Sequence, residues 1–238
     1  MATSIEPIAP WVTQREAQRL LGEKLTLHIN PQSISGFVGS KMPLTVPLAS
    51  RLRLSDRGCA GQSLSKTMNA LHPQVIPTSR FPRAVPFTEV RKYRRVKELI
   101  QCDGDYKATA WYSDFREALK RDGTIVWKGR EFQSLSDIDC FFQDDMLGMI
   151  QSLLRDGYRE DIAPDVGTAM IGADGKLSKS GSGMHRFAAA RELGIEGIPV
   201  VISCIDRSWI RSVNGGFRHR SRRHRLGLQL QSVETAHQ

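Results

Sequence analysis

A glycine-rich segment in the C-terminal part of the chain carries the residue types best suited to hold a phosphate. Residues 181–186 read Gly-Ser-Gly-Met-His-Arg and lead directly into a helix-like run that stops at Gly194. A glycine-rich turn that opens a helix presents free backbone N–H groups and the positive end of the helix dipole, and both favour a bound phosphate. Because His185 and Arg186 lie at the same point, the sequence predicts a phosphate-binding site there.

The predicted site combines backbone and side-chain groups. The candidate phosphate-binding residues are Lys179, Ser182, Gly183, Met184, His185 and Arg186. Backbone N–H groups of the turn would surround the phosphate, and the Arg186 guanidinium would add a forked, charge-assisted contact. His185 is also a candidate catalytic residue, since an imidazole titrates near neutrality and can transfer a proton. In the alternative interpretation, the glycines serve a tight turn and His185 is packed in the core.

The flanking sequence predicts the elements that position these residues. Residues 168–172 are β-like, 173–175 give a turn signal, and 176–178 can return as the second strand of a hairpin. After Gly194, which is typical of a helix end, residues 198–202 form an apolar run rich in β-branched residues, typical of a strand covered on both faces. The predicted order is hairpin, glycine-rich turn, short helix and buried strand.

This ordered set resembles the core motif of the ParB/sulfiredoxin-like superfamily. The resemblance rests on Gly-Ala-Asp-Gly at 172–175, Gly-Met-His-Arg and the Ala-rich helix at 183–191, Leu-Gly at 193–194 and Ile-Pro-Val at 198–200. The whole pattern, with Trp209 after the last strand, is similar to that of bacterial ParB-like domain proteins. The resemblance implies a small α+β domain that binds ATP or another nucleoside phosphate, with Mg²⁺ as the accompanying ion.

Branches of this superfamily differ in their chemistry, and Met184 helps to separate them. Sulfiredoxin needs a cysteine at the position of Met184, so reduction of oxidised cysteine is disfavoured. ParB partition proteins carry a second arginine or a Glu-Arg-Arg box and a helix-turn-helix domain, and the sequence after Ile205 is too short and too aperiodic to supply that domain. Kinases of this fold use a Gly-His box and a catalytic glutamate, so phosphoryl transfer to a hydroxyl, or NTP hydrolysis, stays open.

A long amphipathic helix is predicted before the hairpin. From near Ser136 its apolar residues follow the i, i+3, i+4, i+7 pattern up to Gly157, and Ser136 with Asp139 is expected to form its capping box. The resemblance to the kinases implies an acidic general base just before this helix, so Asp137 and Asp139 are candidate catalytic residues that would remove a proton from a hydroxyl or hold Mg²⁺. In the alternative interpretation, both carboxylates complement the helix dipole.

We expect an α+β protein in four parts. Residues 1–86 hold nine of the eleven prolines and read as a loop-rich arm with one helix at 13–21. Residues 87–129 read as a helical segment with a short strand at its end, and residues 130–210 as the ParB/sulfiredoxin-like domain, a small mixed sheet with packed helices. Residues 211–238 read as a basic, disordered tail.

The net charge of +9 is distributed unevenly over the 238 residues. It amounts to zero for residues 1–35, +9 for 36–98, −6 for 99–206 and +6 for 207–238. The acidic balance around the glycine-rich box weakens a DNA-binding role for that region. The five arginines within Arg218–Arg225 make the tail a candidate for non-specific contact with nucleic acid or an anionic membrane surface, or simply a solvated tail.

Apolar runs, the first residues and the cysteines bear on the location of the protein and on whether zinc or disulfides are expected. No apolar run approaches the roughly 20 residues that span a bilayer, and the first residues lack the pattern of a signal peptide. The cytoplasm is therefore the expected location. The four cysteines are widely spaced, so neither a zinc site nor a disulfide framework is predicted.

Three function classes stay open from the sequence. The first is a nucleotide-dependent enzyme, the second a nucleic-acid-associated DNA-binding or nuclease protein, and the third a non-catalytic binding or scaffold module. The sequence leaves the oligomeric state open.

Overall fold

The computed structural model of the chain describes residues 12–53, 58–127, 129–159, 166–213 and 215–238. The strands are β1 (Thr26–Ile29), β2 (Gly36–Phe37), β3 (Val75–Ile76), β4 (Val85–Pro86), β5 (Ile125–Trp127), β6 (Arg130–Phe132), β7 (Gly167–Ile171), β8 (Leu177–Ser180) and β9 (Ile198–Asp206). The α-helices are α1 (Gln14–Leu21), α2 (Thr45–Arg51), α3 (Gly58–Ala70), α4 (Arg91–Gln101), α5 (Ala110–Asp122), α6 (Leu135–Cys140), α7 (Gly148–Asp156), α8 (Met184–Glu192), α9 (Arg207–Ser212) and α10 (Arg220–Thr235).

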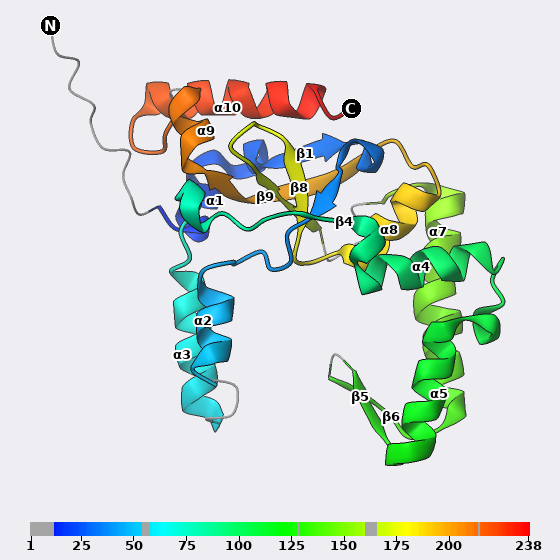
Figure 1. Cartoon of the computed structure of the whole chain (residues 1–238). Coiled ribbons are helices and arrows are strands. Elements are labelled where there is room, and N and C mark those ends of the chain that lie inside the picture. Colours follow the sequence, from blue (N-terminus) through cyan, green and yellow to red (C-terminus); the bar gives the residue numbers. More distant parts are fainter. Residues whose placement is uncertain (1–11, 54–57, 128, 160–165, 214) are drawn as a thin grey trace, which may run out of the picture.

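A mixed sheet forms the centre of the molecule (Figure 1). Its order is β1-β9-β7-β8-β2-β4, and β3 pairs with the end of β9. β7 and β8 form the predicted antiparallel hairpin, and β9 lies parallel to β7. β9 is buried along almost its whole length, as its apolar run indicates. The α+β class and the order hairpin, turn, helix, strand are therefore confirmed.

The N-terminal part of the chain differs from the expected loop-rich arm, because it supplies four strands to this sheet. β1 pairs antiparallel with the first half of β9, and β3 pairs parallel with its last residues. Two side-chain amides reinforce the pairing: Gln14 Nε2 donates to Ser203 O at 2.8 Å, and Gln74 Nε2 donates to Ile202 O at 2.9 Å. The strands are only two to four residues long, too short for a periodic pattern, so the sequence did not reveal that the sheet begins before residue 130.

The helix expected at residues 13–21 forms, and the segment 87–129 is largely helical as expected. α1 begins after Thr13, whose side chain makes a capping box with Glu16, and ends at Gly22. α5 begins after Thr109, whose hydroxyl accepts the N–H of Tyr112, and ends at the left-handed Gly123. Among the described residues, no helix combines the length and apolar character needed to cross a membrane.

The long helix before the hairpin forms, but it begins two residues earlier than predicted. Its cap is Ser134 with Asp137 as the capping-box partner, not Ser136 with Asp139. The sequence offers both serine–aspartate pairs. In the structure the Ser134 hydroxyl accepts the N–H of Asp137 at 3.2 Å, and the Asp137 carboxylate accepts the N–H of Ser134 at 2.9 Å. The helix runs through α6, a π-helical stretch η7 (Phe141–Leu147) and α7.

Two helical regions extend from the same side of the sheet (Figure 1). One is the α2–α3 pair, and the other contains α4 to α7 with the β5–β6 hairpin. An aromatic cluster holds the second region together: Trp111 lies 5.1 Å from Phe142, and Phe115 stacks on Phe141 at 5.8 Å between ring centroids. The rings of this cluster pack together beside α8.

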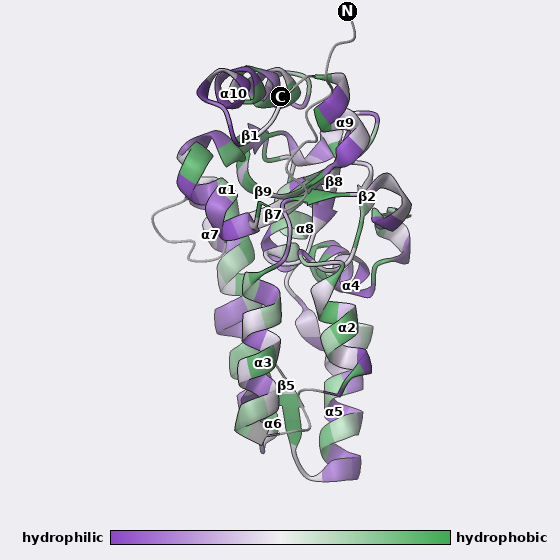
Figure 2. Ribbon diagram, turned by 90° about the vertical axis from the view of Figure 1, so that its left-hand side faces the viewer, coloured by the Kyte–Doolittle hydropathy of each residue, from purple (hydrophilic) through white to green (hydrophobic). Residues whose placement is uncertain are grey.

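The C-terminal residues are a folded helix, where the sequence suggested a disordered tail. α10 lies on the outside of the molecule along β1 (Figure 1), and hydrophilic residues are frequent along it (Figure 2). It buries Leu226, Leu230 and Val233, and its end is tied down because Asn30 N donates to His237 O at 2.6 Å. This i, i+4, i+7 apolar stripe follows the arginines in the chain, and the density of arginines had favoured the prediction of a disordered tail.

Candidate phosphate-binding site

The turn between β8 and α8 requires glycine at two positions. Gly181 has φ +41°, its N–H donates to Gly39 O at 2.5 Å, and a Cβ there would lie 2.8 Å from the backbone nitrogen of Lys41. Gly183 has φ +71° and is the N-cap of α8. Side chains are strongly disfavoured at both places, so the two glycines fix the shape of the turn.

Lys179 is hydrogen-bonded to the backbone around this turn and is not positioned as a phosphate ligand. Its side chain is fully buried, and its ammonium donates to the carbonyls of Thr168 (3.2 Å), Ser180 (2.5 Å) and Ser182 (2.5 Å). Burial lowers the pKa of Lys179 to about 7, and the charge of Lys92 acts in the same direction. The expectation that Lys179 reaches the ligand is therefore replaced by a positioning role.

This lysine determines where the backbone N–H groups of the turn point. The described peptide bonds are trans, and in a trans peptide the C=O and the following N–H point in opposite directions. Since the Ser182 carbonyl is held inward by Lys179, the N–H of Gly183 is directed away from the buried ammonium. The N-cap of α8 is Gly183, which has no side chain to cap the helix, so the first N–H groups of α8, from Met184 to Arg186, lie at the same end as the N–H of Gly183.

Hydroxyl groups beneath the turn tie three strands together. Ser180 Oγ lies 3.0 Å from Thr168 Oγ1 of β7 and 3.2 Å from Ser203 Oγ of β9, and Ser203 Oγ donates to Ala169 O at 3.1 Å. All four residues are buried. A fully bonded polar network in a core restricts movement, so the strand that leads into the turn is held rigidly.

The side chains that follow the turn lie between the sheet and the helical region. His185 is half-buried, with its ring 5.8 Å from Trp127 and nearly parallel to it, and 5.6 Å from Trp111. The Arg186 guanidinium lies 5.9 Å from the ring of Tyr158, while Met184 is buried. Aromatic packing thus orients His185, as the alternative interpretation allowed, and Arg186 remains partly exposed.

Two further basic residues belong to this region and were not selected from the sequence. Lys92 on α4 is exposed and acts electrostatically on Lys179. Lys41 comes within 2.7 Å of the position of a Cβ on Gly181. α4 packs on α8, where Lys97 pairs with Glu192 at 3.2 Å. The basic residues of α4 can be seen in the sequence, but only the tertiary structure shows that α4 lies beside α8.

The two acidic candidates lie elsewhere. Asp137 accepts the N–H groups of Gln133 and Ser134, each at 2.9 Å, and the first of these bonds is the main cause of its lowered pKa. Asp139 accepts from Tyr112 OH at 3.0 Å and pairs with Lys107 at 3.6 Å.

The fold separates both carboxylates from the turn. Figure 2 places α6, which carries Asp137 and Asp139, well away from α8. Within the described residues, their polar partners come from η6 (Tyr106–Ala108), α5 and the residues before α6, and none comes from the Gly181–Met184 turn. The helix-capping interpretation therefore fits the observed contacts of Asp137.

Comparison with known proteins adds no family assignment. No protein-family model matches this chain, and no curated protein or solved structure gives a match to it. The resemblance to the ParB/sulfiredoxin-like superfamily thus rests on the residues of the motif.

Proposed function

We propose that this chain is a ParB/sulfiredoxin-like domain protein that binds the phosphates of ATP or another nucleoside phosphate at the Gly181–Met184 turn. The observation that carries the proposal is the start of α8. It opens on a left-handed glycine, whose lack of a side chain leaves the cap position without a capping group of its own, and the buried amino group of Lys179 holds the Ser182 carbonyl inward. An anion is the natural partner of N–H groups arranged in this way.

The charges around the turn support the same ligand. Arg186 is half-buried on α8, and Lys92 lies on the neighbouring helix. Arg186 offers a planar fork that suits phosphate oxygens, and Lys92 offers a mobile point charge. Mg²⁺ would be held mainly by the phosphates themselves, because the described residues provide no cluster of three acidic, histidine or cysteine side chains.

The proposal concerns binding and does not extend to phosphoryl transfer. Asp137 is engaged in a helix cap and Asp139 bonds to Tyr112, so neither supplies a base at the turn. His185 is oriented by Trp111 and Trp127, and its imidazole would hydrogen-bond a phosphate oxygen.

The test is a thermal-shift and calorimetric screen of the full chain with ATP, ADP, CTP and GTP, each with and without Mg²⁺. A ligand that binds the native state raises its stability, by about 2.7 kcal/mol at one hundred times Kd. We expect binding by the wild type, loss of binding in Arg186→Ala, and unchanged binding in the control Arg116→Ala, an exposed arginine on α5. Absence of heat with all four nucleotides would refute the proposal.

A second candidate function, contact with nucleic acid, is favoured by α10. Arg218, just before α10, and Arg220 and Arg225, in its first two turns, are exposed, and within the described part of the chain none of the three pairs with a carboxylate. The positive end of the helix dipole adds to their potential. A folded surface with these exposed arginines can contact the phosphate backbone of a nucleic acid.

Retention on immobilised DNA and RNA over a range of salt concentrations tests this second function. A variant with alanine at Arg218, Arg220 and Arg225 is expected to elute at lower salt and to show a shallower dependence on salt, by roughly 0.9 in log–log slope per lost phosphate contact on duplex DNA. A variant with alanine at the exposed Arg51, Arg53 and Arg83 is the matched control. Equal retention of the two variants counts against a role for α10.

A further inference from the structure

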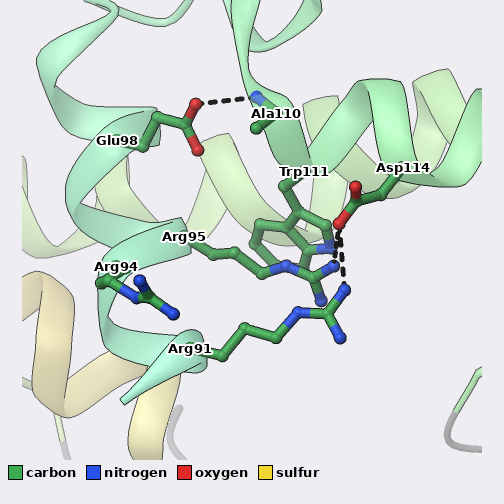
Figure 3. Close-up of a pocket in the computed structure, with 7 residues that line it drawn as sticks. All are labelled: Arg91, Arg94, Arg95, Glu98, Ala110, Trp111 and Asp114. Atoms are coloured by element: carbon green, nitrogen blue, oxygen red, sulfur yellow. Dashed lines mark hydrogen bonds and ion pairs between the residues drawn. The ribbon is translucent and has the colours of Figure 1, made fainter. Parts of the chain in front are cut away.

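A second basic site lies between α4 and α5, on the helical side of the molecule. A pocket of about 340 Å³ is lined by Arg91, Arg94, Arg95, Glu98, Ala110, Trp111 and Asp114 (Figure 3). This volume is at the lower end of the range found for small-molecule sites, roughly 300–1,000 Å³. The pocket therefore has room for a small ligand.

The two carboxylates of the pocket are already engaged. Asp114 accepts from Arg95 at 2.6 Å and from Arg91 at 3.0 Å, and the bond from Arg95 is the main cause of its lowered pKa. Glu98 accepts the N–H of Ala110 at 2.7 Å and so caps α5. Arg94 is exposed, and its guanidinium has no hydrogen-bond or ion-pair partner among the described residues (Figure 3). Three guanidinium groups thus face two carboxylates, and one positive charge is left over.

The floor of the pocket holds a buried donor that lacks an acceptor. Trp111 is 1% exposed, and within the described part of the chain its Nε1 has no hydrogen-bond partner. The indole lies under the Arg95 guanidinium, whose central carbon is 5.2 Å from the ring centroid (Figure 3). A buried N–H without an acceptor is unfavourable, and a ligand oxygen that accepts from it would recover this cost.

We propose that this pocket binds an oxyanion, the phosphate or carboxylate group of a small ligand. Trp111 Nε1 would donate to one oxygen, and the free fork of Arg94 would hold another. The guanidinium groups of Arg95 and Arg91 have five N–H donors each. Each would turn some of these donors from Asp114 toward the ligand and so be shared between the two anions. The site is separate from the Gly181–Met184 turn and does not rest on the function proposed for it.

The indole N–H of Trp111 provides a direct test by two-dimensional ¹⁵N NMR of the full chain. The chain has four tryptophans, so four indole signals are expected, and the one lost in Trp111→Phe identifies the reporter. Should that variant fold poorly, the other three Trp→Phe variants assign the signal by elimination. Sodium phosphate and sodium citrate are titrated separately at low ionic strength, which distinguishes phosphate from carboxylate as the preferred group.

We expect a saturable shift of the Trp111 signal with at least one of the two anions. Arg94→Ala is expected to weaken this binding about tenfold, the size of one charge-assisted hydrogen bond, while Arg116→Ala and Arg186→Ala leave it within about twofold. The proposal is overturned if neither anion moves the Trp111 signal, or if Arg94→Ala titrates like the wild type. A shift lost only in Arg186→Ala would place the anion at the turn and refute the pocket.

Discussion

The Gly181–Met184 turn and the pocket between α4 and α5 both present positive charge, but they arrange it in opposite ways. At the turn the amino group of Lys179 is buried beneath the backbone and is partnered by three carbonyl oxygens. In the pocket the cations surround the cavity, and two of them are paired with Asp114. The turn keeps its N–H groups in place without a ligand, whereas the pocket must rearrange an ion pair to receive one.

If both proposals hold, this difference gives the two anion sites different properties. A preorganised backbone site is selective through geometry, because glycine conformations and strand pairing fix it. In a site made of arginine side chains, the affinity for an anion depends on how strongly a carboxylate of the protein competes with that anion for the same arginines. Trp111 packs against both His185 and Arg95, so a single indole separates the two regions.

The largest expected effect is from breaking the turn with Gly181→Val. The new side chain meets the backbone of Lys41 and forces a β-branched residue to φ +41°. We expect a loss of about 3 kcal/mol in the free energy of unfolding, measured by urea denaturation, together with loss of nucleotide binding. Gly194→Val is the matched control, because it has φ +72° with open space around it. An equal loss in both variants would show that close approach to Lys41 is unimportant.

Removing the buried cation with Lys179→Met tests the turn through its pH dependence. The pKa of Lys179 is lowered from 10.5 to about 7, so between these values the unfolded chain binds a proton that the folded chain lacks. Raising the pH across this window therefore stabilises the wild type relative to the variant, by at most about 1.4 kcal/mol per pH unit. Urea unfolding of both proteins at pH 7, 8 and 9 measures this. A constant difference would contradict the shifted pKa.

A smaller effect is expected where neither region is involved, at the cap of the long helix. Ser134→Ala removes the hydroxyl that accepts the N–H of Asp137, and we expect a loss of about 1 kcal/mol. Ser136→Ala should be nearly neutral. If nucleotide binding also falls in Ser134→Ala, the separation of Asp137 from the turn is wrong.

The smallest change in stability is expected from Asp114→Asn in the pocket. The carboxylate is half-exposed, so its ion pairs contribute less than about 1 kcal/mol, and this contribution is lost as the pH falls through the lowered pKa of Asp114. The free arginines should bind phosphate or citrate severalfold more tightly, as followed by the Trp111 indole signal. Weaker binding in this variant would mean that Asp114 positions the arginines and does not compete with the ligand.

Local signals predicted one part of this protein well. The hairpin, the glycine-rich turn, α8 and β9 follow from turn residues, helix-stop signals and a β-branched run, each of which acts over a few neighbouring residues. The helix at residues 13–21 was predictable for the same reason, because its capping box lies within one turn of the chain. The start of α6 shows the limit of local signals, because Ser134 with Asp137 forms the capping box where Ser136 with Asp139 was expected.

The sequence by itself determined the motif and its chemistry: a glycine turn that needs positive φ, with basic residues at the start of a helix. The tertiary structure decided which groups surround that turn. It buried Lys179 under the backbone, placed Lys92 nearby, kept Asp137 and Asp139 away, and joined α4 with α5 into a pocket. The physical reason is that a turn forms through bonds between near neighbours, while burial and charge depend on elements brought together across the whole chain.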